Sequence, residues 1–356
     1  MKILFKYISL NFFKLFLTCI MSFLVIYLTI DFMSKFWKLS EREVPFIDIC
    51  RYFLYKTPLI LTQITPMATL LATLLTLGIL SRNNEVTVMK ACGISLFQIS
   101  SPILLISLFI SLFSLFTSEY LLPHATQKYK EIERYRPGGS KYRLFKQSNI
   151  WYFGQGIIYQ INHLDLVNGV MNGVTILRVD RDYKIVERID SRQAKLENGL
   201  LTLTNGITRS FHDSLKYEQF KEKMLPTQEK FSDFTVSEPM PEEMTFKKLN
   251  KYIERLKKMG LDYTSYVVDL LAKIAFPLAN FILPLIGIPF ALKTGRSSGI
   301  AAGVGISIII GFTYWITMAF NISLGHVGVL PPFLAAFGSN IIFALIGVVS
   351  IMSVKT

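Results

Sequence analysis

The sequence predicts a polytopic α-helical membrane protein with six transmembrane helices and one inserted, water-facing all-β domain. Its 51% apolar composition over 356 residues and mean hydropathy of +0.41 exceed what a soluble core of this length requires. The apolar residues also gather in long uncharged runs, and nearly all of the charge lies between these runs. Short alternating segments rich in Ile, Val, Tyr and Thr occupy the middle of the chain, which indicates strands.

The uncharged runs set the number of spanning helices. A helix that crosses the hydrocarbon core needs about 20 mainly apolar residues. The last run is long enough for two such helices, and the turn-favouring residues Asn321, Gly325, Gly328 and Pro331 predict the break between them. Six helices are therefore expected from the runs at 15 to 30, 57 to 81, 91 to 118, 274 to 292 and 297 to 354.

The distribution of basic residues predicts the orientation. Short cytoplasmic segments carry an excess of Lys and Arg. If the N-terminus is cytoplasmic, its side of the membrane holds a single acid, Glu85, against many basic residues, whereas the segment 31 to 56 on the other side has mixed charge. Both termini are then cytoplasmic and the large insert faces outward. The basic residues on the cytoplasmic side are Lys2, Lys6, Lys14, Arg82, Lys90, Lys293, Arg296 and Lys355.

The insert between the third and fourth helices is predicted to be a β domain. Four Asn-Gly pairs, a dipeptide that suits tight hairpin turns, begin at residues 168, 172, 198 and 205. A sandwich, a jelly roll and an open barrel all fit such strands. A connector helix capped by Thr245 should follow and end near Met259. The candidate strands are 149 to 153, 156 to 162, 173 to 180, 184 to 190, 200 to 204 and 207 to 212.

These patterns divide the chain into three parts. Residues 1–122 hold the first three membrane helices and a short cytoplasmic helix within 81–95, residues 123–262 hold the outer domain and its connector helix, and residues 263–356 hold the last three helices. Cys19, Cys50 and Cys92 fall at different depths, so no disulfide is expected. The four histidines lack metal-ligand spacing, and no catalytic or metal-binding residues are expected.

The polar segment from Leu80 to Ser95 is too long for a simple turn. Ser81 or Asn83 can cap a short helix there, Glu85 falls in its first turn, and Gly93 should end it. Glu85 then either complements the helix dipole or contacts a cytoplasmic partner.

Two further groups of residues have a structural and a functional interpretation. Gly299, Gly303 and Gly305 allow close helix approach, either as ordinary packing or as a subunit seam or moving gate. Lys35 and Lys38 lie beside Phe36 and Trp37, either as an interfacial anchor or as a site for phosphorylated lipid headgroups.

Three segments resemble the LptF/LptG family of lipopolysaccharide export permeases. They are the opening MKILFKYI, the second helix with its polar segment, LLATLLTLGILSRNNEVTVMKACGIS, and the stretch LAKIAFPLANFILPLIGIPFALKTGRSSGIAAGVGIS. The opening and the SRNNE segment are more similar to LptG than to LptF. The resemblance covers essentially the whole chain.

The resemblance implies one permease half of an ABC transporter in the bacterial inner membrane. It would pair with LptF above an LptB homodimer and pass lipopolysaccharide to LptC and then LptA through a periplasmic jelly-roll-like domain. The chain itself would be no enzyme and hold no cofactor, since ATP and Mg would be bound by LptB. The LptF paralogue and a membrane-anchored periplasmic sensor or tether are the alternatives.

The resemblance also implies roles for single residues. Glu85 falls on the family's coupling-helix glutamate, so Glu85, Arg82 and Met89 are expected to contact LptB. Lys35 and Lys38 are the nearest counterparts of residues that contact lipid phosphates, although Asp31 stands where some relatives are expected to have a basic residue. The family's lateral gates use the first and fifth helices, which gives Gly299, Gly303 and Gly305 a sliding role.

Overall fold

The computed structural model describes residues 2–41, 44–133, 147–154, 157–165, 169–180, 185–197, 199–211, 216–227, 240–258, 261–294 and 300–353. Two compact units make up the chain. One is helical and consists of Met1–Tyr135 together with Met240–Thr356, and the other is Arg136–Pro239 and carries the strands. The helical unit and the sheet are considered separately below.

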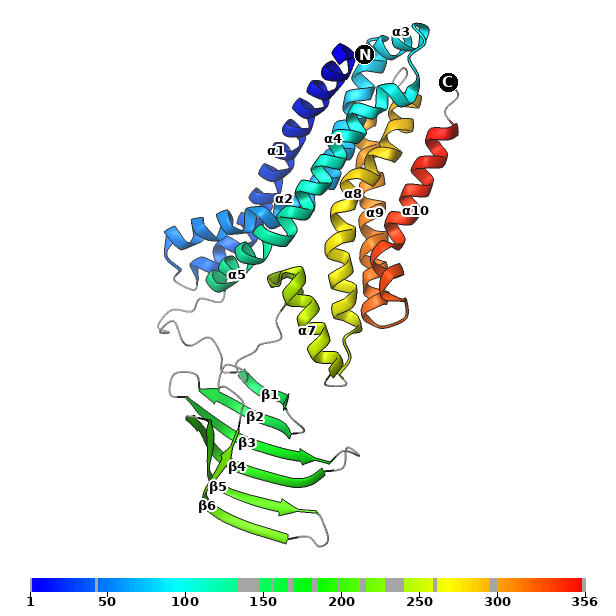
Figure 1. Ribbon diagram of the computed structural model, residues 1–356. Helices are drawn as coiled ribbons and strands as arrows, with labels where there is room; N and C mark the ends of the chain where they lie inside the picture. The colour runs from blue at the N-terminus through cyan, green and yellow to red at the C-terminus, as the bar shows by residue number, and fades with distance from the viewer. Residues whose placement is uncertain are drawn as a thin grey trace. The chain divides into compact units, whose positions relative to one another are not determined.

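The helical unit contains six helices that are long and apolar enough to cross a membrane, which confirms the predicted number (Figure 1). The break between the last two falls after His326, within the predicted turn region. Most helices extend beyond the apolar runs because a helix can continue past the hydrocarbon layer. They are α1 (Lys2–Ser40), α2 (Phe46–Arg82), α4 (Leu96–Phe116), α8 (Thr264–Thr294), α9 (Ile300–His326) and α10 (Pro332–Ser353).

The third span continues past α4 through a π-helical segment, η1 (Thr117–Leu121), into α5 (Leu122–Glu133). Helix α5 packs on α2, where Tyr129 lies edge-on to Tyr52 with ring centroids 5.8 Å apart. Both tyrosines are buried, so α5 covers one end of the α1–α2 pair.

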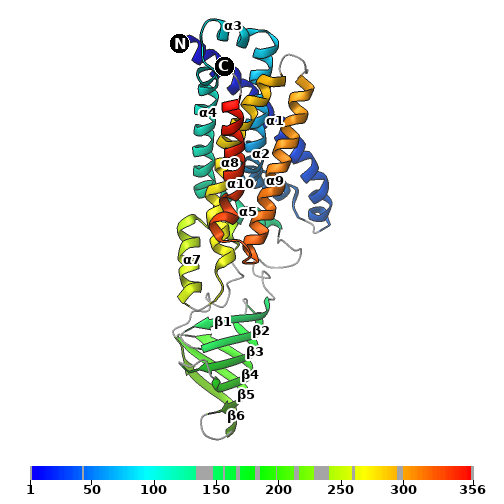
Figure 2. The same cartoon turned by 90° about the vertical axis from the view of Figure 1, so that its right-hand side faces the viewer.

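Two helices form the centre of the helical unit and two lie at its periphery. In its most apolar stretch α2 has 72% of its residues buried and α8 has 67%, against 17% in α1 and 22% in α9. Leu70, Leu74 and Leu77 of α2 and Leu283 of α8 belong to the central core. Figure 2 shows α9 and α10 beside α8. The outer faces of α1 and α9 are therefore left for lipid or for another protein.

Neighbouring helices supply hydrogen bonds to the proline-rich helix α8, which contains Pro277, Pro284 and Pro289. The Ser111 hydroxyl of α4 donates to the Pro277 carbonyl at 3.0 Å, and the Asn340 amide of α10 donates to the Ala275 carbonyl at 2.7 Å. These two bonds tie α8 to α4 and α10 at membrane depth.

Helix α3 (Glu85–Ala91) lies at the same end of the helical unit as the start of α1 and the end of α10 (Figures 1 and 2). The turn from α1 to α2, helix α5 and the turn from α9 to α10 lie at the opposite end. This arrangement follows from an even number of crossings, and below we refer to the α3 end and the α5 end.

The connector helix α7 (Phe246–Lys258) belongs to the helical unit. Thr245 caps it as predicted, since its hydroxyl accepts the Lys248 N–H at 3.3 Å. Leu249 and Ile253 on its apolar face pack against Leu270 of α8. Because α5 and α7 both pack on the helices, the β unit is shorter than the outer domain drawn from the sequence at 123–262.

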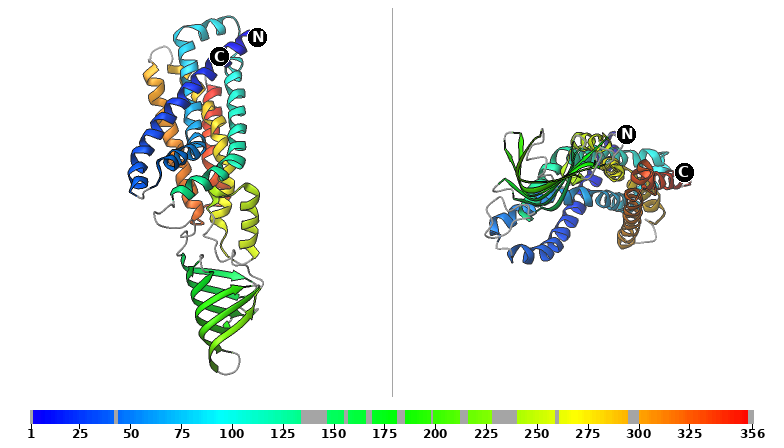
Figure 3. Two further views of the ribbon diagram at one scale, coloured as in Figure 1. Left: turned by 90° about the vertical axis from the view of Figure 1, so that its left-hand side faces the viewer. Right: turned by 90° about the horizontal axis from the view of Figure 1, so that it is seen from below.

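The β unit is one antiparallel sheet with the sequential order β1-β2-β3-β4-β5-β6, and Figure 3 shows its curvature. Its buried face is built from alternating positions such as Ile161, Val174 and Leu203. An inserted all-β domain was predicted correctly, and the described strands follow one another as a meander. They are β1 (Gln147–Gly154), β2 (Ile157–Asp165), β3 (Val170–Val179), β4 (Ile185–Glu197), β5 (Leu200–Ser210) and β6 (Lys216–Pro226).

Two of the four Asn-Gly pairs do not make hairpin turns. Gly169 and Gly199 lie at turns between strands, but the pairs at 172 and 205 lie inside β3 and β5. The predicted strands 200–204 and 207–212 are therefore one strand, in which Asn205 has a φ of 53°. A side chain at Gly206 would meet the Asp190 carbonyl and the Phe220 ring, so a glycine is required there for close approach.

Candidate functional site

The corner between α2 and α3 holds the predicted coupling residues. Arg82 ends α2 and is exposed, and Asn84 turns the chain with a φ of 60°. Asn84 is the N-cap residue of α3 and makes no side-chain cap bond. The prediction that Ser81 or Asn83 caps this helix is wrong, because α2 continues through Arg82 and leaves only two residues for the turn.

Glu85 is the first residue of α3 and is half-buried. One carboxylate oxygen accepts a hydrogen bond from the Tyr7 hydroxyl of α1 at 3.0 Å, and the other accepts one from the Asn83 amide at 3.3 Å. The carboxylate thus joins the start of α1 to the α2–α3 corner. A displacement of either element changes the environment of this charge.

The two faces of α3 differ. Val86 is buried in the central core and Met89 packs against that core from the same face. Val88 is 59% exposed, on the face that also carries Glu85. Of the three predicted coupling residues, the corner therefore presents Arg82 and part of Glu85 outward, while Met89 supports the helix from within. Val88 was missed, although its spacing of three from Glu85 signals a shared face.

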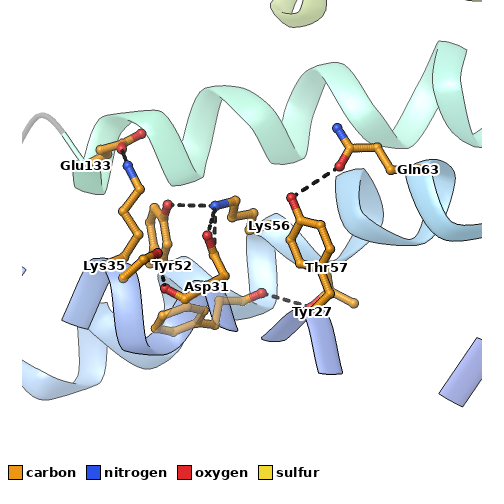
Figure 4. A network of polar contacts seen from close by, with 10 residues as sticks. Tyr27, Asp31, Lys35, Tyr52, Lys56, Thr57, Gln63 and Glu133 are labelled. Carbon is orange, nitrogen blue, oxygen red and sulfur yellow. Dashed lines mark hydrogen bonds and ion pairs between the residues drawn. The ribbon is translucent and has the colours of Figure 1, made fainter. Parts of the chain in front are cut away.

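A polar network joins α1, α2 and α5 at the α5 end (Figure 4). The Lys35 ammonium on α1 lies 2.5 Å from Glu133 on α5, and both side chains are about one-third exposed. Next to it the Lys56 ammonium on α2 lies 2.7 Å from both oxygens of Asp31 and donates to the Tyr52 hydroxyl at 3.2 Å. The network therefore holds α1 against α2 and α5 at the α5 end.

The network involves one of the two lysines that were predicted to contact lipid phosphates. Lys35 already has a carboxylate partner, and the side chain of Lys38 lies outside the described residues. Lys56 was not predicted as a functional residue, although the sequence shows it as a charge at the edge of the apolar run of α2. Such a residue needs a partner, and Asp31 on α1 is that partner.

The glycines of α9 divide into two kinds. A side chain added at Gly303 or Gly305 would meet nothing within 4 Å, while Gly299 lies outside the described residues. By contrast, a side chain at Gly325 would meet Val268 of α8 at 3.0 Å and also Ala335 of α10. The predicted glycines thus leave space on the surface of this chain, and close packing within the chain uses Gly325.

The exposed side of α9 is apolar along its length. Its large exposed residues are Ile308, Ile309, Phe312, Ile316 and Phe320. Among the residues that the structure describes, no cluster of three His, Cys, Asp or Glu residues could hold a metal ion.

Six membrane-length helices, divided three and three around an inserted β domain, define a polytopic α-helical membrane protein. Residues 6–353 match the family described as "Lipopolysaccharide export system permease LptF/LptG", and the chain belongs to that family.

Named relatives agree with this assignment. The chain is 24% identical over 335 residues to "Lipopolysaccharide export system permease protein LptG" of Escherichia coli (strain K12), with 89% of each chain covered. It is 21% identical over 295 residues to the protein of the same name from Haemophilus influenzae, with 78% of this chain and 76% of the relative covered.

Proposed function

We propose that this chain is one permease half of an ABC transporter that extracts lipopolysaccharide from the inner membrane and passes it to a periplasmic carrier, driven by ATP hydrolysis in partner subunits. The observation that carries the proposal is the family match over nearly the whole chain. The six apolar helices and the family together support an inner-membrane protein. The proposed orientation puts the α3 end in the cytoplasm and the β unit in the periplasm.

The partners in this proposal are those that the family resemblance implies, and the uncovered surfaces leave room for them. Apolar faces on α1 and α9 suit a second permease of the LptF type, with which this chain would enclose a lipid cavity. An LptB homodimer would bind beneath α3 and supply the ATP and Mg sites, so this chain would need no cofactor and catalyse no reaction. LptC and then LptA would receive the lipid from the periplasmic side.

The α2–α3 corner is the proposed contact with the ATPase. Glu85, Arg82 and Val88 supply a charged and an apolar contact on one surface. Met89 would act by fixing the helix on the core rather than by touching the partner. Through the bond between Tyr7 and Glu85, movement of the ATPase would reach the start of α1.

The outer end of α1 is the proposed contact with lipid phosphates. Lys35 would have to exchange Glu133 for a phosphate as lipid enters, so the ion pair would open when lipid binds and form again when it leaves. Lys38 is the second proposed contact. Gly303 and Gly305 leave room on α9 for a helix of the partner permease to slide, as a lateral gate requires.

The central test is purification of the complex in mild detergent with Glu85→Lys. The proposal expects this variant to lose the co-purifying ATPase or its lipid-stimulated activity, because a reversed charge replaces the Tyr7 and Asn83 bonds. The matched control is Glu254→Lys, which makes the same charge change at an exposed position on α7. Unchanged ATPase content together with unchanged stimulation in Glu85→Lys would contradict the proposed role.

The same purification distinguishes the alternatives. An LptF-type partner identified by mass spectrometry would assign this chain the LptG position, and an LptG-type partner would assign it the LptF position. A sensor or tether would purify without an ATPase.

A further inference from the structure

A cavity of about 400 Å³ lies at the α5 end of the helical unit, where η1 meets the start of α7 and the outer part of α8. Its lining includes both apolar and charged side chains. Its lining residues are Leu115, Phe116, Ser118, Glu119, Tyr120, Phe246, Lys247, Lys273 and Ile274.

Two of the charged lining residues hold the start of α7 in place. The Glu119 carboxylate accepts the Phe246 N–H at 2.8 Å, and the Lys273 ammonium donates to the Met244 carbonyl at 2.6 Å. These two contacts come from separate helices, η1 and α8. The two contacts therefore fix the start of α7 beside the cavity.

Lys247 also lines the cavity, but it does not hold α7 in place. It is exposed and makes no ion pair with the residues that the structure describes. Lys248, the following residue, and Lys251, one turn further along the same helix, are also exposed, so a positive surface continues from the cavity along α7. Glu254 is the single acidic residue of that helix.

The aromatic residues around the cavity indicate its depth. Phe116 is 58% exposed and Tyr120 is 62% exposed, one turn apart on the third span, with ring centroids 4.8 Å apart. Exposed aromatic residues next to basic residues at the end of an apolar span are typical of the level of the lipid headgroups.

We propose that this cavity binds an anionic phospholipid of the surrounding leaflet, with its phosphate at Lys247 and the first part of an acyl chain against Phe116 and Ile274. The positive surface of α7 selects an anionic headgroup. The volume holds a headgroup phosphate and the start of one acyl chain. The proposed occupant is a phospholipid of the surrounding leaflet, separate from the exported cargo.

Bound lipid retained by the purified complex tests the site. Native mass spectrometry after incubation with phosphatidylglycerol or phosphatidylcholine gives the number of lipids bound. The wild type should retain one more phosphatidylglycerol than phosphatidylcholine. In Lys247→Glu the retention of that lipid should fall about tenfold, because a lysine near an anionic headgroup is replaced by a repelling charge.

Lys257→Glu is the matched control, since Lys257 is an exposed lysine on the same helix. It lies about 15 Å further along the axis, ten residues away at 1.5 Å each, and should retain the lipid. Equal retention in the two variants, or equal binding of both phospholipids by the wild type, would overturn the proposal. Loss of bound lipopolysaccharide in place of phosphatidylglycerol from Lys247→Glu would assign the site to the cargo and also overturn it. The assay needs no ATP and no transport, so its failure would leave the export proposal standing.

Discussion

The Lys56 ammonium on α2 lies 2.7 Å from both carboxylate oxygens of Asp31 on α1, and each side chain is only 11% exposed. Removing one member of a buried ion pair leaves an uncompensated charge, which costs about 3–5 kcal/mol. Asp31 is therefore a structural partner of Lys56 as well as an acidic residue close to the proposed lipid contacts.

Asp31→Asn should lower the thermal stability of the purified complex markedly, because Lys56 would stay buried without its counter-charge. The double variant Asp31→Asn with Lys56→Met should recover most of the loss, since it removes both charges. The measurement is the unfolding temperature in detergent. A double variant as unstable as the single one would show that the pair is not the source of the effect.

The opposite faces of α3 predict opposite phenotypes. Val88→Glu should leave abundance and unfolding temperature unchanged but reduce the co-purifying ATPase about fivefold, as for the loss of one central interface contact. Met89→Ser should lower the unfolding temperature, because Met89 packs on the core. Immunoblots and thermal scans of the two complexes measure both effects. A stable Met89→Ser complex that lacks the ATPase would instead make Met89 a direct contact.

The two kinds of glycine on α9 also separate folding from assembly. Gly325→Val should destabilise the helical unit by about 1–3 kcal/mol, since the new side chain meets Val268 and Ala335. Gly303→Val has open space within this chain and should fold normally, yet it should weaken pairing with the partner permease. Abundance and partner content after purification distinguish the two outcomes. Normal pairing in Gly303→Val would argue against a partner at that surface.

The β unit should lose stability in acid through Asp190. Burial alone would raise the pKa of Asp190, but hydrogen bonds from Arg188 and Thr175, together with the charges of Arg188 and Arg209, outweigh it and hold the pKa below the ordinary value of 3.8. A carboxyl group with a lowered pKa stabilises the fold fully above its ordinary value, and this contribution is lost as the pH falls through the lowered one.

The comparison of wild type with Asp190→Asn across pH isolates this contribution. The difference in unfolding temperature between them should be largest above about pH 5 and shrink below about pH 4. A difference that stays constant across this range would show that the ionised form of Asp190 contributes nothing.

The membrane-spanning part of the fold could be predicted because lipid forces every backbone group to find an internal partner, which makes a long apolar run a helix. The residue at which α2 ends and α3 begins could not be predicted. It depends on how Val86 and Met89 pack against the core, which is a tertiary contact.

The strands were predicted well where apolar residues alternate and poorly where charge dominates. β6 was missed because Lys221, Glu222 and Lys223 give it a polar sequence, yet Phe220 and Leu225 pack on the sheet core. Charged residues are common on a strand at the edge of a sheet, where they discourage unwanted pairing. The sequence shows Asp31 and Lys56 as charged residues, but their ion pair could not be predicted without the relative positions of α1 and α2.

The π-helical segment η1 sets the direction in which the side chains of α5 point. A wide turn holds one extra residue, and each residue advances a helix by about 100° at 3.6 residues per turn. Everything after Leu121 on the same helix is therefore rotated relative to a regular continuation of α4. A one-residue deletion there would turn Glu133 to another side of the helix and break its ion pair with Lys35, so this pair depends on the number of residues in the segment.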